Sequence, residues 1–336
     1  MRTSATLPLL RDLATTTDQY EAARRAATRA LGAGWPEDPA TLPLLRDLAT
    51  TDQNEDEDIR ETAVEALAAG WPEDPATLPL LRDLATTDQD WAARRAAVEA
   101  LAAGWREDPG TLPLLRYRAT TDQDEYVREA ATRALAAGWP EDPATLPLLR
   151  NRATTDEHEY VRQAAVRALA AGWPEDPGTL PLLLNRATTD QDRAAVRALA
   201  AGWPEDPGTL PLLLNRATTD QDEAARRAAV EALAAGWPED PATLPLLRDR
   251  ATTDQHEYVR EAATRALAAG WREDPATLPL LRDLATTDQD RAARRAAVEA
   301  LAGGWREDPG TLPLLRDLAT TDQNEDVPYS QLSERP

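Results

Sequence analysis

Residues 106–139, with the sequence REDPGTLPLLRYRATTDQDEYVREAATRALAAGW, contain the pattern that decides the fold. The second half carries apolar residues at the i, i+3, i+4, i+7, i+8 spacing of an amphipathic helix, namely Val127, Ala130, Ala131, Ala134 and Leu135. The first half predicts another helix, which opens at Asp108-Pro109 and places Pro113 in its first turn, where a missing N–H costs least. The run 122–124 interrupts both patterns and predicts the N-cap of the second helix, and we expect Gly138 to end that helix in the left-handed conformation.

The same segment recurs along the whole chain. Gly-Trp occurs nine times, mostly 34 residues apart, at Trp35, Trp71, Trp105, Trp139, Trp173, Trp203, Trp237, Trp271 and Trp305. A single helix pair cannot bury its apolar faces alone, so neighbouring copies must stack. We therefore predict one all-α array over residues 1–336, a right-handed α–α solenoid. Its predicted repeats are 1–35, 36–71, 72–105, 106–139, 140–173, a short 174–203, 204–237, 238–271, 272–305 and a partial 306–336.

Composition narrows the possible functions. The chain has 59 Asp and Glu against 37 basic residues, all of them Arg, and its net charge is −22. Such a chain is a poor ligand for nucleic acid, whose backbone is bound through cationic side chains. There is no Cys, which excludes disulfides and thiolate metal sites, and the apolar runs are too short for a transmembrane helix. We expect an acidic cytoplasmic protein with neither nucleic acid nor membrane as a partner.

One motif inside the repeat resembles a known family. An Asp precedes an Arg by six residues, with an apolar residue before the Arg and Ala-x-x-Ala-Leu after it, as in Asp122, Val127, Arg128, Ala131, Ala134 and Leu135. This pattern resembles the HEAT repeat in the short form of phycobilisome-lyase-like HEAT proteins. The same spacing occurs at Asp18/Arg24, Asp88/Arg94, Asp156/Arg162, Asp220/Arg226, Asp254/Arg260 and Asp288/Arg294, and repeat 2 stretches it to Asp52/Arg60. The resemblance implies that these side chains pair between adjacent repeats as a ladder, and we expect Asp122 to lose its partner if Arg128 is removed.

Two further resemblances bear on function. A tetratricopeptide array also has a period of 34 residues, but the large aromatic and small residues that it needs inside the helices are not found. The Gly-Trp-Pro-Glu-Asp-Pro junction is similar to HEAT-type repeats in the sensor regions of actinobacterial NACHT-class signalling NTPases. Because a P-loop needs a Lys and this chain has none, the likeness extends to the repeat region only.

The polar residues do not form a recognisable catalytic or metal-binding group. The two His residues, His158 and His256, lie three repeats apart at predicted helix starts, too far apart to share a metal. Acidic pairs such as Glu107-Asp108 recur in every copy, whereas general acid–base catalysis needs one carboxylate made different from the other. We expect a non-enzyme with no cofactor and no metal, and a HEAT-fold lyase is the least supported alternative.

Positions that vary between copies are the better candidates for partner recognition. The Gly-Trp residues are invariant, so we interpret them as seals between successive helix pairs; Trp91 alone stands outside that series. On the second helix, an outward-facing pair four residues apart changes from copy to copy, and in HEAT arrays these helices usually line the concave surface. We call these positions the outward row, and its candidate partner-binding residues are Arg95, Glu99, Glu129, Arg133, Gln163, Arg167, Arg193, Arg197, Arg227 and Glu231. A row of solvated ion pairs is the alternative interpretation.

Two irregularities interrupt the array. The residue after Thr-Leu-Pro-Leu-Leu is Arg in eight copies but Leu184 and Leu214 in repeats 6 and 7, and we expect these Leu residues to be exposed and to seed a contact patch, with sequence drift as the alternative. Repeat 6 also lacks four residues of its second helix. Four residues are about one turn, so the apolar stripe stays in phase while the Asp/Arg pair is lost.

The ends of the array lack the polar caps that solenoids need. The first helix carries the same Leu7, Leu9, Leu10 and Leu13 as the internal copies, and Pro328 in segment 327–332 allows at most a short capping helix. End-to-end self-association is therefore predicted. The favoured function is a non-catalytic scaffold that binds a protein or peptide along the second-helix face, and the main alternative is a sensor module that works with a P-loop NTPase.

Overall fold

The computed structural model describes residues 6–16, 21–51, 57–189 and 192–325. Nineteen α-helices and no strand occur among these residues, which confirms the predicted all-α solenoid. The helices divide into two units, Met1–Pro174 and Glu175–Pro336, and each unit is described by itself. The predicted capping segment 327–332, and the first two ladder acids Asp18 and Asp52, lie outside the described residues.

Helices of ten to fifteen residues alternate with short turns in both units. The helices of the first unit are α1 (Thr6–Thr15), α2 (Glu21–Gly34), α3 (Thr41–Thr50), α4 (Glu57–Gly70), α5 (Thr77–Thr87), α6 (Trp91–Gly104), α7 (Thr111–Thr121), α8 (Glu125–Gly138), α9 (Thr145–Thr155) and α10 (Glu159–Gly172). Those of the second unit are α11 (Thr179–Thr189), α12 (Arg193–Gly202), α13 (Thr209–Thr219), α14 (Glu223–Gly236), α15 (Thr243–Thr253), α16 (Glu257–Gly270), α17 (Thr277–Thr287), α18 (Arg291–Gly304) and α19 (Thr311–Glu325). None of the helices in the described ranges has the length and apolar character needed to cross a membrane.

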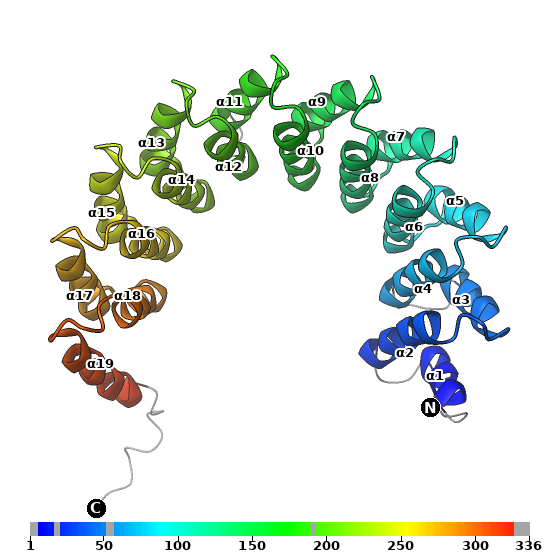
Figure 1. Cartoon of the computed structure of the whole chain (residues 1–336), viewed down its shortest axis with the longest axis horizontal. Coiled ribbons are helices and arrows are strands. Elements are labelled where there is room, and N and C mark those ends of the chain that lie inside the picture. The colour runs from blue at the N-terminus through cyan, green and yellow to red at the C-terminus, as the bar shows by residue number, and fades with distance from the viewer. Residues whose placement is uncertain (1–5, 17–20, 52–56, 190–191, 326–336) are drawn as a thin grey trace, which may run out of the picture. The chain divides into compact units, whose positions relative to one another are not determined.

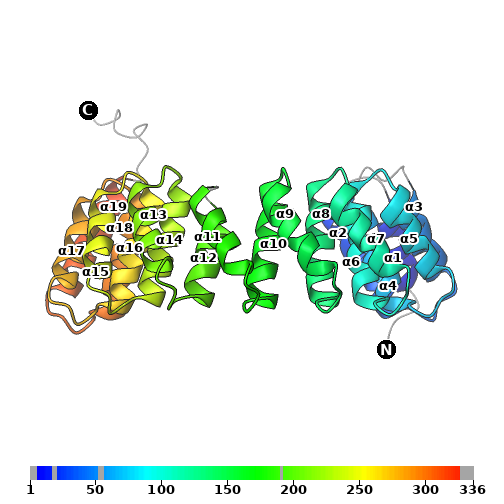
Figure 2. The same cartoon turned by 90° about the horizontal axis from the view of Figure 1, so that it is seen from above.

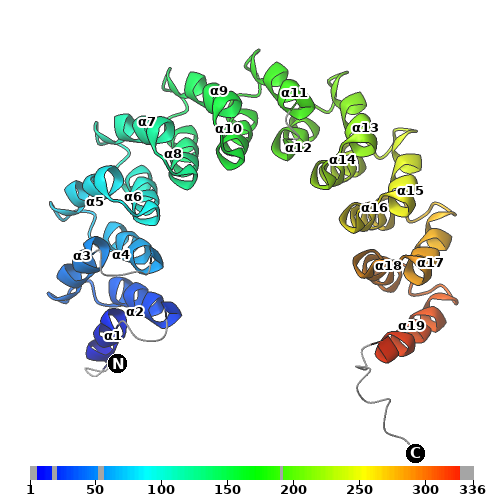
Figure 3. The same cartoon turned by 180° about the vertical axis from the view of Figure 1, so that it is seen from behind.

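Within each unit the helices form two layers (Figure 1). The odd-numbered helices contain the Thr-Leu-Pro-Leu-Leu strings and pack against the even-numbered helices that follow them. The even-numbered helices also pack against one another, and Figures 1 and 3 show them on the inner side of the curve in each unit. Seen from above in Figure 2, the helices of each unit stand side by side. The curvature has a simple cause: Ala-rich helices approach closely, whereas the odd-numbered helices contact one another sparsely.

Local capping explains where each helix begins and ends. Asp124 accepts the N–H of Tyr126 at 2.9 Å, so the predicted N-cap of α8 is confirmed. Helix α7 begins at Thr111, not at Asp108-Pro109. Asp108 instead closes a turn, in which its side chain accepts the N–H of Gly110 and its carbonyl accepts the N–H of Thr111.

The predicted left-handed Gly138 is wrong. Helix α8 does end at this glycine, but no left-handed φ occurs there. The residue that leaves the helical conformation is Trp139, with φ −135° and ψ 53°. An extended φ of this kind needs no glycine, and the Trp139 carbonyl then accepts the N–H of Asp142, which starts the turn into the next repeat.

The core of each repeat consists of Leu, Val and Ala from both layers. Leu115 of α7 and Val127, Ala131 and Leu135 of α8 have no exposed surface. The Gly-Trp side chains are half-buried at the junctions, and Trp139 packs against this core while the guanidinium of Arg106 lies 5.8 Å from its ring centroid. In the shortened α12 the apolar stripe stays buried, as predicted, at Ala194, Ala195, Val196 and Leu199.

Candidate partner-binding surface

A buried Arg on an even-numbered helix joins each repeat to the next. Arg128 is 4% exposed, and its Nε and Nη2 donate to both carboxylate oxygens of Asp156 in the following repeat, each at 3.0 Å. Its Nη1 donates to the main-chain carbonyl of Asp122 in its own repeat at 2.8 Å. One guanidinium therefore ties two repeats together. We call this series the Arg–Asp ladder, and the equivalent pairs are Arg60–Asp88, Arg94–Asp122, Arg226–Asp254 and Arg260–Asp288.

The structure corrects which Asp each Arg binds. The expectation that Asp122 depends on the Arg128 side chain is wrong, because the Asp122 carboxylate accepts from Arg94 of the preceding repeat at 2.9 and 3.1 Å. The same carboxylate also accepts the N–H of Asp124, so only the carbonyl of Asp122 remains for Arg128. Arg162 likewise donates to the carbonyl of its own Asp, Asp156, at 2.8 Å.

Hydrogen bonding lowers the pKa of three ladder carboxylates, those of Asp122, Asp156 and Asp254. Burial by itself raises the pKa of Asp122, but hydrogen bonds from Arg94, from the N–H of Asp124 and from Arg118 outweigh it and lower the pKa. The same balance, with their own Arg partners, lowers the pKa of Asp156 and Asp254. A lowered pKa favours the charged form of these three carboxylates, which suits a structural ion pair better than proton transfer.

Sequence reasoning missed a second group of Arg residues that supports the ladder. At the eighth position of the odd-numbered helices, the middle repeats have Arg where the outer repeats have Leu, at Arg118, Arg152, Arg186, Arg216 and Arg250. Arg152 donates to Asp156 at 3.2 Å, so Asp156 is bound by an Arg from each of two repeats. The signal in the sequence was a change from Leu to Arg at a position that is buried in other copies, such as Leu284.

Arg216 bridges the gap that the shortened repeat 6 leaves. Helix α12 lacks the residue that carries the ladder Arg in other copies. Arg216, which is 7% exposed, instead hydrogen-bonds with Asp220 in its own repeat and reaches back to the carbonyl of Ala187 in α11. Arg118 makes a similar contact, from its Nη2 to the carbonyl of Thr86 in α5 at 2.9 Å, so odd-numbered helices join repeats both beside a ladder pair and where the ladder Arg is missing.

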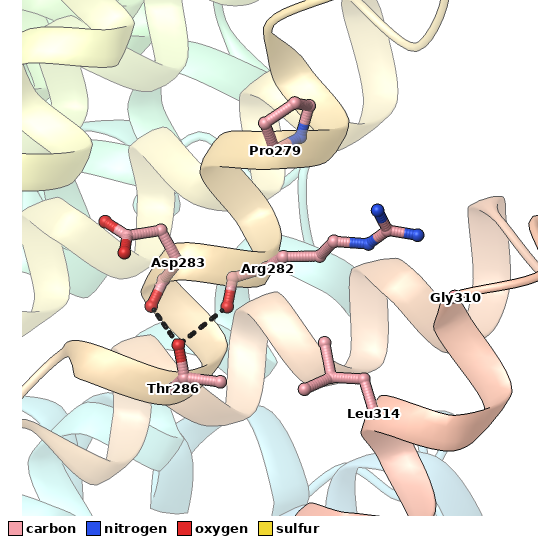
Figure 4. Close-up of a pocket in the computed structure, with 6 residues that line it drawn as sticks. All are labelled: Pro279, Arg282, Asp283, Thr286, Gly310 and Leu314. Atoms are coloured by element: carbon pink, nitrogen blue, oxygen red, sulfur yellow. Dashed lines mark hydrogen bonds between the residues drawn. The ribbon is translucent and has the colours of Figure 1, made fainter.

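A second series of inter-repeat ion pairs follows the odd-numbered helices. The Arg after each Thr-Leu-Pro-Leu-Leu string pairs with the Asp of the next Gly-Trp junction, in the pairs Arg11–Asp38, Arg46–Asp74, Arg82–Asp108, Arg116–Asp142, Arg248–Asp274 and Arg282–Asp308. Figure 4 shows Arg282 extending from α17 toward Gly310, beside a shallow hollow that Pro279 and Leu314 also line. At these six junctions the Asp carboxylate is already paired, so its charge is less available to a partner than the sequence alone indicates.

Leu184 and Leu214 interrupt these outer pairs. Both side chains are half-buried, so the prediction that they are exposed is wrong. Leu184 packs beside Gly208 of the next repeat, at the place that Arg82 takes beside Gly110 in the first unit. An apolar contact therefore replaces an ion pair, and the two Leu residues do not form an open patch.

The even-numbered helices carry the outward row on the inner face of each unit. The second member of each pair is well exposed: the side chain of Arg133 is 58% exposed and that of Arg197 is 61% exposed. The first member lies deeper in some pairs, as with 20% of the Glu129 side chain exposed, but not in all: the Arg227 side chain is 42% exposed and that of Glu231 is 38% exposed. Gln163 is buried and hydrogen-bonds with Glu159 and Arg167, so its predicted place among the partner-contacting residues is wrong.

Ion pairs between repeats cross-link the outward row. Arg95 bonds to Glu61 of the preceding repeat at 2.6 Å, and Arg133 lies 3.5 Å from Glu99. In the second unit Glu231 accepts from Arg197 at 3.2 Å and from Arg227 at 2.8 Å, and Arg193 is half-buried beside this pair. The more exposed of these pairs, such as Arg133–Glu99 and Arg197–Glu231, contribute little to stability.

Two equivalent grooves lie between even-numbered helices on the same face. One, between α2 and α4, has a floor that includes Gly32 and Ala66. The other, between α14 and α16, has a floor that includes Ala234 and Ala262, with Glu231 at its rim. The inner face thus alternates small apolar floors with charged rims.

Three aromatic residues break the uniformity of repeats 3–5, at the N-terminal ends of α6, α8 and α10. The ring centroids of Trp91 and Tyr126 are 5.0 Å apart, and those of Tyr126 and Tyr160 are 6.1 Å apart. Tyr126 is 38% exposed and Tyr160 is 53% exposed. We call these three residues the aromatic strip; the guanidinium of Arg95, 5.4 Å from the Trp91 centroid, connects it to the outward row. Sequence reasoning missed the strip because its members come from different repeats and meet only through stacking.

The two His residues occupy N-cap positions of even-numbered helices. The N–H of His158 donates to Asp156 at 3.0 Å, and the N–H of His256 donates to Asp254 at 3.0 Å. His158 Nδ1 also lies 3.6 Å from a Glu125 oxygen, next to the aromatic strip.

Comparisons with known proteins agree with this architecture. The model of the HEAT-repeat family matches residues 1–68, 52–136, 133–201, 192–268 and 265–330. No curated protein matches the sequence.

Several solved structures share the fold at low sequence identity. YibA of Escherichia coli is 18% identical and matches over 86% of this chain and 99% of its own, with a TM-score of 0.51. Kap95p, in a structure with RanGDP, is 15% identical over 99% of this chain and 50% of its own, with a TM-score of 0.56. Kap121p bound to Nup53p is 15% identical over 95% of this chain and 40% of its own, with a TM-score of 0.54. The chain therefore spans about half of Kap95p and two fifths of Kap121p, and the likeness shows the fold alone. Because the HEAT-repeat model matches nearly all of the sequence, the chain belongs to the family of HEAT-repeat proteins.

Proposed function

We propose that this chain is a non-catalytic scaffold that binds a protein or peptide along the inner face of its even-numbered helices. One observation carries the proposal: the side chains that differ between copies, such as Arg133 and Tyr160, are exposed on this face, while the core and the Arg–Asp ladder recur nearly unchanged. Kap95p and Kap121p, which share the fold, are solved in complexes with RanGDP, Nup1 and Nup53p. These complexes support a protein-binding use of the fold.

The charge of the chain supports a protein partner in the cytoplasm and argues against nucleic acid. With 59 acidic residues against 37 basic residues and a net charge of −22, the chain is a poor ligand for a phosphate backbone, which is bound through cationic side chains. The competing proposal is a sensor module that works with a P-loop NTPase, in line with the likeness to NACHT-class repeats; its P-loop Lys would lie outside these 336 residues. A lyase-type enzyme, as the likeness to phycobilisome-lyase HEAT proteins suggests, has less support because the pKa is lowered for Asp122, Asp156 and Asp254 alike, and no one of the three is set apart as a general acid.

Self-association through the terminal layers is part of the proposal. Leu13 of α1 is 39% exposed, whereas its equivalents Leu48 and Leu84 are 5% and 4% exposed because a neighbouring repeat covers them. At the other end, Leu312 of α19 is 52% exposed. A second copy stacked on either layer would reuse the internal contact between repeats.

Site-specific photo-crosslinking tests the binding face. A photoreactive amino acid at Arg133 or Arg167, on the inner face, should capture the same partner protein from a cell extract. The matched control positions, Thr120 and Thr154, are exposed at the ends of odd-numbered helices and should not capture it. Equal capture from both sets of positions would contradict the assignment of the inner face.

A further inference from the structure

We propose that the aromatic strip, together with the acidic residues beside it, binds the cationic side chains of a basic peptide segment in extended conformation. The inference rests on the proposed function and names the partner chemistry at one place on the inner face. It concerns only repeats 3–5, which lie within the first unit.

The fold does not require the aromatic rings. At the position of Tyr126, three other even-numbered helices carry an alanine: Ala92, Ala224 and Ala292. Those helices form with the same length and the same buried stripe. The rings of Tyr126 and Tyr160 therefore add exposed aromatic surface without completing a core.

Carboxylates surround the strip and determine the sign of its ligand. Five acidic residues lie within the caps and first turns of the same three helices, namely Asp90, Asp124, Glu125, Glu157 and Glu159. The Arg residues beneath them, such as Arg128, are buried and already paired in the ladder. A helix N-terminus alone disfavours a cation, and Asp90 already pairs with Arg60 at 3.3 Å. The groups that attract a cation here are therefore the carboxylates of Glu125 and Glu157 and the electron-rich ring faces.

The strip already holds one guanidinium in this manner. Arg95 lies over the ring of Trp91 at 5.4 Å while its Nη2 donates to Glu61 at 2.6 Å. A ring on one side and a carboxylate at the tip are the two elements that recognise an Arg side chain. Tyr126 and Tyr160 supply further ring faces, and Glu125 and Glu159 supply carboxylates in the same first turns of α8 and α10.

The spacing of the rings indicates the conformation of the ligand. Tyr126 and Tyr160 have centroids 6.1 Å apart. In an extended peptide, alternate side chains point to the same side about 6.6–6.8 Å apart, from a rise of about 3.3–3.4 Å per residue. An Arg-x-Arg segment therefore places successive guanidinium groups on successive rings. A neutral proline-rich segment would use the rings without the carboxylates, and the experiment separates the two.

The chain supplies its own matched control. Helices α8 and α16 have the same sequence, EYVREAATRALAAG, and Tyr126 contacts the rings of Trp91 in α6 and Tyr160 in α10. Tyr258 of α16 lies between α14 and α18, and neither of these helices contains an aromatic residue. Tyr258→Ala and Glu257→Gln therefore remove the same groups from the same helix sequence outside the strip.

Fluorescence anisotropy with the full chain tests the proposal. The probe is a fluorescein-labelled peptide with Arg at alternate positions separated by Gly and Ser, and the comparison peptides carry citrulline in place of Arg or a neutral proline-rich sequence. We expect Tyr126→Ala and Tyr160→Ala to weaken binding of the Arg peptide by about tenfold, the scale of a desolvated cation–π contact. Glu125→Gln should weaken it by about threefold, whereas Tyr258→Ala and Glu257→Gln should change it by less than about twofold. The citrulline and proline-rich peptides should not bind measurably.

Several results would overturn the proposal. Equal losses for Tyr126→Ala and Tyr258→Ala would show that the peptide follows overall charge, and equal binding of the citrulline or proline-rich peptide would show that the carboxylates do not select the ligand. Thermal unfolding followed by circular dichroism checks that each variant is folded. If Tyr126→Ala is unfolded, two other variants decide the outcome: Tyr160→Ala, at a more exposed position, should weaken binding, and the conservative Tyr126→Phe should retain it. Crosslinking from Arg133 that persists while the probe ignores the strip would refute this inference and leave the proposed function standing. A probe that responds to the strip variants, without partner capture at Arg133, would support this inference and refute the proposed function.

Discussion

Arg128 and Arg260 occupy the same position in two helices of identical sequence, yet we expect their removal to cost different amounts of stability. Without Arg128, Asp156 still accepts from Arg152 at 3.2 Å and from the N–H of His158 at 3.0 Å. Without Arg260, the Asp288 carboxylate still accepts the N–H of Asp290 at 2.8 Å. Its own repeat has Leu284 at the position that Arg152 occupies beside Asp156, so no second Arg in the described part of the chain remains to pair with Asp288. The two variants thus compare a buried carboxylate that retains an ion pair with one that loses it.

The expected magnitudes follow from that difference. Arg260→Ala breaks a buried ion pair from one side and should lower the free energy of unfolding by about 3–5 kcal/mol. Arg128→Ala removes hydrogen bonds to a carboxylate that stays paired, and should cost about 1–3 kcal/mol. The Arg128 side chain is 5% exposed and the Arg260 side chain is 13% exposed, so Arg128→Ala loses more packing. This packing loss is smaller than the cost of leaving Asp288 unpaired, so Arg260→Ala should still cost more. Arg133→Ala, at an exposed position, should cost less than about 0.5 kcal/mol.

Urea titration of helix content measures these costs, with each curve fitted to a nearest-neighbour model of repeat unfolding. A thermodynamic cycle adds the Arg152→Ala variant and the Arg128→Ala/Arg152→Ala double variant. The double variant should lose more stability than the two single variants together, because only it removes both Arg side chains from Asp156. Our reasoning about the supporting Arg fails if Arg128→Ala costs as much as Arg260→Ala, or if the cycle is additive.

Three further predictions follow from the same geometry. Folding lowers the pKa of Asp156, so its stabilising effect is complete above the unfolded pKa of about 3.9 and is lost as the pH falls toward the folded pKa. Asp156→Asn should therefore flatten the decline of the thermal midpoint between pH 5 and 3. An unchanged slope would contradict this prediction. Leu184→Arg should restore an outer ion pair with Asp206 and raise stability by about 0.2–1 kcal/mol in thermal unfolding at low salt, and no gain would show that the apolar contact is equivalent. Self-association measured by light scattering should depend on concentration and disappear in Leu10→Glu or Leu315→Glu while the middle repeats stay folded; a monomeric mass at high micromolar concentration would rule it out.

The sequence by itself determined the helix pairs, their repeat and the buried stripe. These features depend on local physics: apolar spacing selects one helix face, and Asp124 caps a helix whose first N–H groups lie within reach of its own side chain. Even the loss of one turn in repeat 6 was readable, because four residues preserve the phase of the stripe.

The tertiary structure alone decided how the repeats recognise one another. Arg128 pairs with the carboxylate of Asp156, 28 residues ahead, and bonds only to the carbonyl of Asp122, six residues behind. Which carboxylate Arg128 binds depends on the acidic residue that the next repeat places near it. The burial of Gln163, the packing of Leu184 and the meeting of Tyr126 with Trp91 and Tyr160 have the same origin. Each depends on side chains from adjacent repeats, whose separation and rotation are set by the stacking of the Ala-rich helices and by no local pattern within one repeat.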